Sequence, residues 1–186
     1  MCPIIRSSEG EREAVFEAAK LMLAAARTAP KSGGVDDVKT LIVYGSEKDS
    51  LADEMEKIAA ERGIANFKRD ARNVRDSEAV ILIGVQGTKS FRLNCGTCGY
   101  RNCEEFERAE KKKGQDFIGP TCILKALDLG IALGSAVKTA SMLNVDNRVM
   151  YRIGVAAKRL EMLPEATLVI GIPLSVKGKN IFFDRR

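Results

Sequence analysis

The sequence contains no histidine and no tryptophan, and aromatic residues make up only 5% of its 186 residues. Without histidine, Ser-His and Cys-His nucleophilic pairs and imidazole-ligated metals are excluded. The scarcity of aromatic side chains disfavours a surface on which nucleic-acid bases stack. The chemistry that remains open must therefore use thiols, carboxylates, hydroxyls and amines.

Long apolar runs are also absent, and no stretch approaches the roughly 20 apolar residues that cross a bilayer. The N-terminal segment becomes charged at Arg6, which is too early for a signal peptide. We therefore expect a cytoplasmic protein that binds neither membrane nor nucleic acid. The 30 basic and 25 acidic residues give a net charge of +5, which is spread along the chain and favours anionic partners only weakly.

Hydrophobic patterning predicts helices that alternate with strands. Apolar residues at helical spacing predict helices over residues 7–29, 49–62, 122–143 and 149–160. Short runs rich in branched side chains predict strands over residues 38–44, 79–85 and 167–172. The second strand is apolar on both faces, so we expect it at the centre of a sheet. Because there is no repeat and no linker, the chain is predicted to be a single domain of the α/β or α+β class.

Four of the five cysteines lie between the second predicted strand and the long helix, at Cys95, Cys98, Cys103 and Cys122. A cytoplasmic protein keeps its thiols reduced, so clustered cysteines indicate metal binding or redox work rather than structural disulfides. Four thiolates without imidazole restrict the metal to zinc or an iron–sulfur cluster. The fifth cysteine, Cys2, is isolated near the N-terminus and is predicted to be an ordinary free thiol.

Glycine follows each of the first two cysteines of the group, and Gly119-Pro120-Thr121 precedes the fourth. Glycine lets backbone N–H groups turn toward sulfur, which stabilises a reduced cluster. Cys122 stands at the start of the long helix, where free N–H groups and the helix dipole favour an anionic cluster. These features favour a 4Fe–4S cluster, and structural zinc or unligated thiols remain the alternatives.

The run from Cys95 to Phe106 has the pattern C-G-x-C-G-x-x-x-C-x-x-F. With Cys122, it resembles the 4Fe–4S domain of electron-transfer complex subunits and of the corrinoid iron–sulfur protein. Residues 29–34, 124–135 and 167–173 resemble segments of the nitroreductase fold. The chain is thereby identified as a member of the ferredoxin-domain family in which a nitroreductase-like chain carries a cysteine insert. This resemblance implies one domain over residues 1–186, a mixed sheet flanked by helices, and an iron–sulfur insert over residues 92–122.

The same resemblance implies a function in electron transfer through one 4Fe–4S cluster on the four cysteines. It also implies a homodimer and a redox partner, either a protein or a small-molecule electron acceptor, and leaves open whether the chain is an enzyme. Two alternatives stand beside it. One is an FMN-dependent oxidoreductase whose cluster feeds a flavin at the dimer interface. The other is a non-catalytic protein that holds structural zinc in the same four thiolates.

A flavin phosphate would need loop amides and basic side chains. The candidates are Arg27, Lys31, Ser32, Gly33, Lys177, Lys179 and Arg185. Where nitroreductases have an asparagine after Gly-Gly this chain has Val35, and their N-terminal R-R-S motif is missing. We therefore predict that FMN is absent or weakly held, and that the segment 31–34 is either an anion-binding loop or a simple connection. Asp36 and Asp37 are predicted to cap or solvate that loop.

Overall fold

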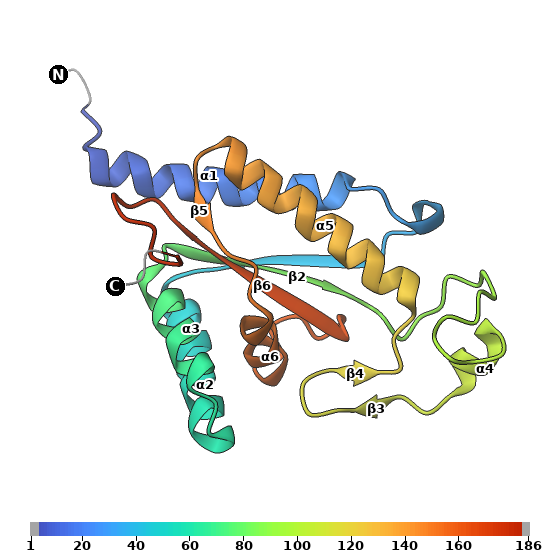
Figure 1. Cartoon of the computed structure of the whole chain (residues 1–186). Helices are drawn as coiled ribbons and strands as arrows, with labels where there is room; N and C mark the ends of the chain where they lie inside the picture. The colour runs from blue at the N-terminus through green and yellow to red at the C-terminus, as the bar shows by residue number, and fades with distance from the viewer. Residues whose placement is uncertain (1–3, 184–186) are drawn as a thin grey trace.

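The sheet at the centre of the molecule forms from the three apolar runs that the sequence marks as strands (Figure 1). The computed structural model describes residues 4–183 of the chain. The strands of the sheet, in spatial order, are β1 (Val38–Val43), β2 (Ala79–Val85), β6 (Leu168–Ser175) and the short β5 (Asp146–Asn147). Every residue of β2 is buried, and this strand pairs with β1 on one side and β6 on the other. The prediction of a central second strand is confirmed.

The strand pairs of this sheet all run antiparallel, which corrects the expectation of a mixed sheet. The reason lies in the connection after β1. Helices α2 (Gly45–Arg62) and α3 (Ala65–Asp76) pack against each other and are joined by a tight turn at Gly63, which has φ +67°. Such a hairpin of helices returns the chain to the end of the sheet that it left, so β2 runs opposite to β1.

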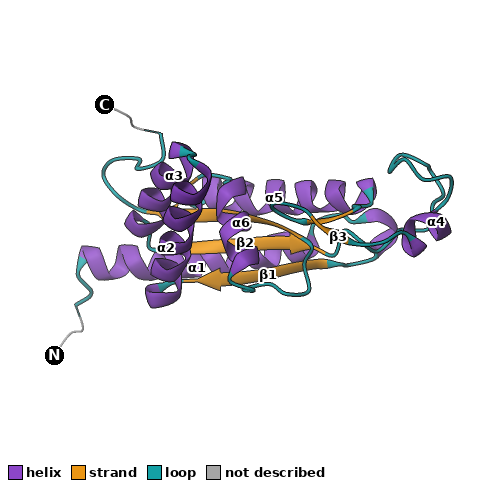
Figure 2. Cartoon of the chain, turned by 90° about the horizontal axis from the view of Figure 1, so that it is seen from below, coloured by secondary structure: helices purple, strands orange, loops and turns teal. Residues whose placement is uncertain are grey.

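Helices cover both faces of the sheet (Figures 1 and 2). Helices α1 (Ser7–Thr28) and α5 (Ile123–Met142) lie on one face, and α2, α3 and α6 (Tyr151–Arg159) lie on the other. Side chains along β2 alternate between the two cores: Ile81 and Ile83 pack with α1 and α5, whereas Val80 and Leu82 pack with the other three helices. This alternation follows from the two-residue period of a strand.

The helix boundaries largely follow the predicted signals. Helix α1 ends before Pro30, and α2 ends at the glycine that adopts a left-handed conformation. Helix α3 was not predicted, although its buried side chains, Phe67, Asp70, Ala71 and Val74, recur at the three- and four-residue spacing of a helix. In the part of the chain that the structure describes, no helix is both long and apolar enough to cross a membrane.

The insert extends beyond the end of the sheet (Figure 2). It contains the short helix α4 (Cys103–Arg108) and a two-stranded ribbon of β3 (Lys112–Lys113) and β4 (Ile118–Gly119). At the same end of the sheet, the 3-10 turn η1 (Ser32–Gly34) connects α1 to β1. Both segments singled out by the sequence thus lie close to the start of α5.

Candidate functional site

The two ends of the insert are fixed to the sheet and to each other. The amide of Cys122 donates to the carbonyl of Gly87 at 2.8 Å, and the amide of Gly87 donates to Thr167 Oγ1 at 2.8 Å. A Cβ on Gly87 would lie 2.6 Å from Thr121 Cγ2, so only glycine allows this close approach. The fourth cysteine is therefore held, buried, at the point where the insert begins and ends.

The other three cysteines lie in a much more open setting. Cys95 is exposed, and Cys98 and Cys103 are half-buried. The amide of Asn94 donates to Cys103 Sγ at 3.3 Å, and the amide of Cys103 donates to Asn94 Oδ1 at 2.9 Å. This reciprocal pair brings Cys103 beside the start of the cysteine motif.

The glycines of the motif have left-handed backbones, with φ +70° at Gly96 and +87° at Gly99. This conformation costs most residues roughly 1–2 kcal/mol and costs glycine little. The turn at Gly96 brings Thr97 back to Cys95, where the hydroxyl and the backbone N–H of Thr97 lower the pKa of the Cys95 thiol. Hydrogen bonds of this kind favour the thiolate, which is the form that binds metal.

Phe106 anchors this part of the insert. It is fully buried and packs edge-to-face against Tyr100, with ring centroids 5.7 Å apart. The ammonium of Lys111 lies 4.5 Å from the centroid of the Phe106 ring. At the start of α4, Asn102 accepts from the amide of Glu105 at 2.8 Å, which caps the helix. The phenylalanine of the motif thus supports the segment that carries Cys103.

The structure thus shows where all four predicted cysteines lie, but it does not bring their thiols together into one site. Over residues 4–183, no three cysteine, aspartate or glutamate side chains are grouped closely enough to hold a metal ion. Three thiols lie in the open part of the insert, and the fourth is buried at its base. Cys2 and Arg185 lie outside the described residues.

The loop after α1 contrasts with the insert, because its polar groups are already bound within the chain. The amide and the hydroxyl of Ser32 both donate to Asp128 Oδ1 at 2.8 Å. The ammonium of Lys31 donates to the carbonyls of Ala26 at 3.3 Å and Ala29 at 2.8 Å. The loop does bind an anion, but that anion is the chain's own carboxylate.

A neighbouring side chain closes the same loop from outside. Gly33 has φ +55°, and a Cβ at this position would lie 2.5 Å from the ring of Phe91. Phe91 belongs to the segment that leads into the cysteine motif. The structure therefore places this loop against the segment that leads into the cysteine motif.

A network of charges, three of them buried and one exposed, joins the loop to α5. Its members, called here the buried ion network, are Asp37, Lys89, Lys125 and Asp128. The fully buried Lys125 Nζ lies 2.8 Å from Asp37 Oδ2 and 3.9 Å from Asp128 Oδ2. Lys89 Nζ lies 3.1 Å from the other oxygen of Asp37. Burial raises the pKa of Asp37, but hydrogen bonds from both lysines outweigh it and hold the pKa below its usual value.

Neither Lys125 nor Asp128 was predicted as part of a site. A signal was present, because the two charges stand three residues apart near the start of a helix that is otherwise mostly apolar. Such a pair on the buried face of a helix indicates an internal ion pair.

Asp36 behaves as predicted, because it accepts from the amide of Val38 at 3.1 Å and pairs with Arg27. The same prediction is wrong for Asp37, which is buried against Lys125. Burial raises the pKa of Asp36, but the hydrogen bonds from Arg27 and Val38 lower it by more, so the pKa lies below its usual value.

The basic residues considered for a flavin phosphate do not converge within one chain. Arg27 donates to the carbonyl of Val38 at 2.9 Å, beside the end of β2. Lys177 pairs at 3.6 Å with Glu78, which precedes β2, and the exposed Lys179 lies two residues further along. A strand of seven residues such as β2 spans about 20 Å. Arg27 and Lys31 thus lie at the opposite end of the sheet from Lys177 and Lys179.

Comparison with known proteins gives both close and distant relatives. Residues 118–185 match the family described as uncharacterized proteins containing a ferredoxin domain (DUF2148). This region includes Cys122 but not the other three cysteines. A protein of Archaeoglobus fulgidus, described as uncharacterized, is 47% identical over 182 residues, which cover 98% of this chain and 97% of the relative.

Solved structures share the fold at low identity. A nitroreductase with bound FMN from Desulfitobacterium hafniense has a TM-score of 0.56 and 13% identity, with 88% of this chain and 78% of that chain covered. Nitroreductase CinD from Lactococcus lactis, in complex with nicotinic acid, has a TM-score of 0.54 and 18% identity, with 97% and 86% covered. At such identities the likeness establishes the fold alone, and it confirms the predicted nitroreductase-like α+β fold.

Proposed function

The chain belongs to the family of proteins containing a ferredoxin domain, and we propose that it carries single electrons through one 4Fe–4S cluster. The proposed ligands are Cys95, Cys98, Cys103 and Cys122. The observation that carries the proposal is the donor set itself: four thiols from one insert, in a chain without histidine. Such a cluster, with all four iron positions ligated by protein, supplies one-electron chemistry rather than a substrate-binding site.

The four thiols are the type of ligand that an iron–sulfur cluster takes, but their positions require a change in the chain when the cluster binds. Cys122 is fixed by the hydrogen bond from its amide to Gly87, whereas the contacts of the motif are local, such as the bond from the amide of Gly99 to the carbonyl of Gly96. We therefore propose that the local turns around Cys95 and Cys98 adjust on cluster binding, while Cys122 keeps its position. Thr97, which donates to Cys95, and Asn94, whose amide donates to Cys103, supply N–H groups to two of the sulfurs.

Anaerobic purification with iron, sulfide and zinc analysis tests this function directly. We expect iron and sulfide in equal amounts and a broad absorption band near ~400 nm, which are the marks of such a cluster. Replacing Cys98 or Cys103 with serine should abolish iron binding, and Cys2→Ser should leave it unchanged. Colourless protein that contains zinc, or equal loss of iron in all three variants, would overturn the proposal.

A flavin is the alternative that the solved structures favour, since one of these nitroreductases contains FMN. The geometry of the loop disfavours a flavin phosphate, because the polar groups of Ser32 and Lys31 already donate hydrogen bonds to acceptors within the chain. We propose that FMN is absent or weakly held. Titration with FMN, followed by quenching of flavin fluorescence, checks this. Stoichiometric quenching at sub-micromolar FMN would show that a flavin site exists.

We also propose a cytoplasmic homodimer that packs through the outer face of α5. Leu127 and Ile131 are exposed on this face, and a Cβ on Gly130 or Gly134 would meet nothing within 4 Å. Two such faces allow close helix contact and bury apolar area. Sedimentation at micromolar concentration should give a dimeric mass for the wild type and a monomeric mass for Ile131→Arg. A control on the other side of the sheet, Leu160→Arg, should remain dimeric.

A further inference from the structure

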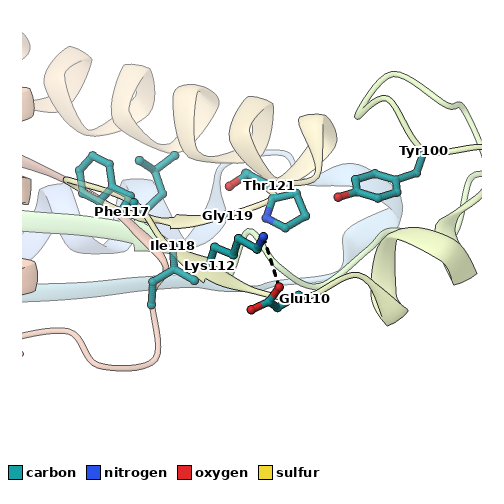
Figure 3. A pocket seen from close by; sticks show the side chains of 10 residues that line it. Tyr100, Glu110, Lys112, Phe117, Ile118, Gly119 and Thr121 are labelled. Atoms are coloured by element: carbon teal, nitrogen blue, oxygen red, sulfur yellow. Dashed lines mark ion pairs between the residues drawn. The ribbon is translucent and has the colours of Figure 1, made fainter.

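A cavity of about 710 Å³ opens between the insert and the end of the sheet (Figure 3). Nine of its ten lining residues belong to the insert, and the tenth is Leu168 of β6. Ligand pockets in proteins occupy about 300–1,000 Å³, so the space is large enough for a small organic molecule. Because the insert builds the cavity, the cavity belongs with the proposed cluster rather than with the underlying fold.

Aromatic side chains stand at two sides of the cavity, with Thr121 between them (Figure 3). Tyr100 is held edge-on against the buried Phe106, and Phe117 is held against Tyr151 with ring centroids 5.2 Å apart. Walls that are held by other residues need little reordering when a ligand enters.

A second set of contacts fixes the Phe117 side of the cavity. The hydroxyl of Tyr151 donates to Asp116 Oδ2 at 2.7 Å, and Arg62 Nη1 donates to Asp116 Oδ1 at 2.6 Å. Burial and the hydrogen bond to the Asp116 carboxylate raise the pKa of Tyr151 to about 12, so its hydroxyl remains a donor. These contacts connect the turn between β3 and β4 to α2 and α6, so the Phe117 side of the cavity is held by the rest of the fold.

The cavity adjoins both parts of the proposed ligand set. Tyr100 lies between Cys98 and Cys103 in the sequence, and Thr121 directly precedes Cys122. A molecule in the cavity would contact the chain segments that carry three of the four thiols. This is the position that a small-molecule redox partner of the cluster would require.

The charges and polar groups define the ligand further. The two ionised groups of the lining, Glu110 and Lys112, have opposite signs, pair with each other at 3.3 Å and are mostly exposed. They contribute no net charge, so nothing in the lining selects an anion. The hydroxyls of Tyr100 and Thr121 are donors that suit a carbonyl oxygen.

We propose that this cavity binds a flat, uncharged, conjugated carbonyl compound of the quinone class. The proposal rests on the proposed iron–sulfur function, for which such a compound would be the small-molecule partner. Aromatic walls favour a planar ring, paired charges favour a neutral one, and the two hydroxyls favour carbonyl oxygens.

Calorimetric titration of the anaerobically purified chain with menadione, a neutral naphthoquinone, tests the proposal. We expect Tyr100→Ala and Phe117→Ala each to weaken binding by about ten-fold, because each removes an aromatic wall. Tyr100→Phe keeps the ring and should weaken binding only about three-fold. Tyr44→Ala, which removes an exposed tyrosine far from the cavity, should leave it unchanged. The charged analogue 1,4-naphthoquinone-2-sulfonate should bind more weakly than menadione.

Iron content is measured on every sample, so that the two proposals fail separately. Absence of menadione binding in protein with its full iron content overturns the cavity proposal and leaves the iron–sulfur function standing. Equal binding by the wild type and both alanine variants also overturns it. Binding that depends on both walls in protein that never acquires iron supports the cavity and overturns the proposed function.

Discussion

Two segments of this chain look similar in sequence and differ in structure: the loop over residues 31–37 and the cysteine motif over residues 94–103. Both contain glycines with left-handed backbones and groups that suit a ligand. In the loop, the amide, hydroxyl and ammonium groups are bound by Asp128 and by carbonyls of the same chain. In the motif, the thiols are more open and the hydrogen bonds are local. The presence of suitable residues is therefore a weaker guide to a ligand site than the availability of their polar groups.

The difference has a physical cause in α5. This helix brings Lys125 and Asp128 under the loop, about one and two turns after Cys122. Buried charges are costly unless they are paired, and here the two carboxylates and two ammonium groups of the buried ion network balance. The loop thus gains its partners from inside the protein, whereas α5 offers the motif only the single thiol at its start.

The largest effect is expected from removing the centre of the buried ion network. Lys125→Met would leave Asp37 buried with the half-exposed Lys89 as its ionic partner, and Asp128 buried with the neutral donors of Ser32. Breaking a buried pair in this way costs about 3–5 kcal/mol, which we expect as the loss in free energy of unfolding in a urea titration.

A matched control separates burial from charge. Lys89 also pairs with Asp37, but its side chain is 53% exposed. Exposed pairs contribute about 0–1 kcal/mol, so Lys89→Met should lower the free energy of unfolding by no more than that. Equal losses of stability in the two variants would show that the buried Lys125 does not stabilise the loop more than the exposed Lys89 does.

The next effect comes from the contact of Phe91 with the loop. Gly33→Ala adds a Cβ 2.5 Å from the Phe91 ring and strains a backbone at φ +55°, so we expect a loss of about 2–4 kcal/mol. Gly34→Ala has similar backbone strain but meets nothing within 4 Å, so it should cost about 1–2 kcal/mol. In the motif, Gly96→Ala meets only an ordinary contact at 3.6 Å and should resemble Gly34→Ala. Losses of the same size in all three variants would contradict the packing of Phe91 on the loop.

The two segments also show what the sequence could and could not establish. Strand 79–85 was predictable to its ends, because an uninterrupted apolar run that is bounded by polar residues has one stable place in a sheet. The cysteine set was visible as a pattern for a similar reason: its spacing is local. The partners of Ser32 were not predictable, because Asp128 lies 96 residues away and only the fold brings them together.

Smaller effects should appear on lowering the pH, and the two segments should differ here too. Hydrogen bonds from lysines hold the pKa of Asp37 below its unfolded value of about 3.9, so the stability that it contributes is present above that pH. It is lost as the pH falls through the lower, folded-state pKa. Free energies of unfolding measured over a series of pH values from 6 downward should fall less steeply for Asp37→Asn than for the wild type.

Glu107 provides the matched carboxylate in the insert. Bonds from Ser90 and Arg92 lower its pKa as well, but it is only partly buried, so Glu107→Gln should leave the acid dependence close to that of the wild type. If both variants change the slope of the free energy of unfolding against pH equally, the loop over residues 31–37 and the insert do not differ in how tightly their charges are bound.

The smallest effect is expected in the motif itself, in the metal-free chain. Cys98 is half-buried in a turn whose bonds are local, and serine is close to it in size and geometry. Cys98→Ser should therefore change the free energy of unfolding of metal-free protein by less than about 0.5 kcal/mol, as substitutions at open positions usually do. The same substitution should abolish iron binding, so the stability gained on loading the wild type with iron should be missing in the variant. Urea titrations with and without iron, on wild type and variant, provide the four values. A loss of several kcal/mol already in the metal-free chain would place Cys98 among the structural residues and make the motif as closed as the loop.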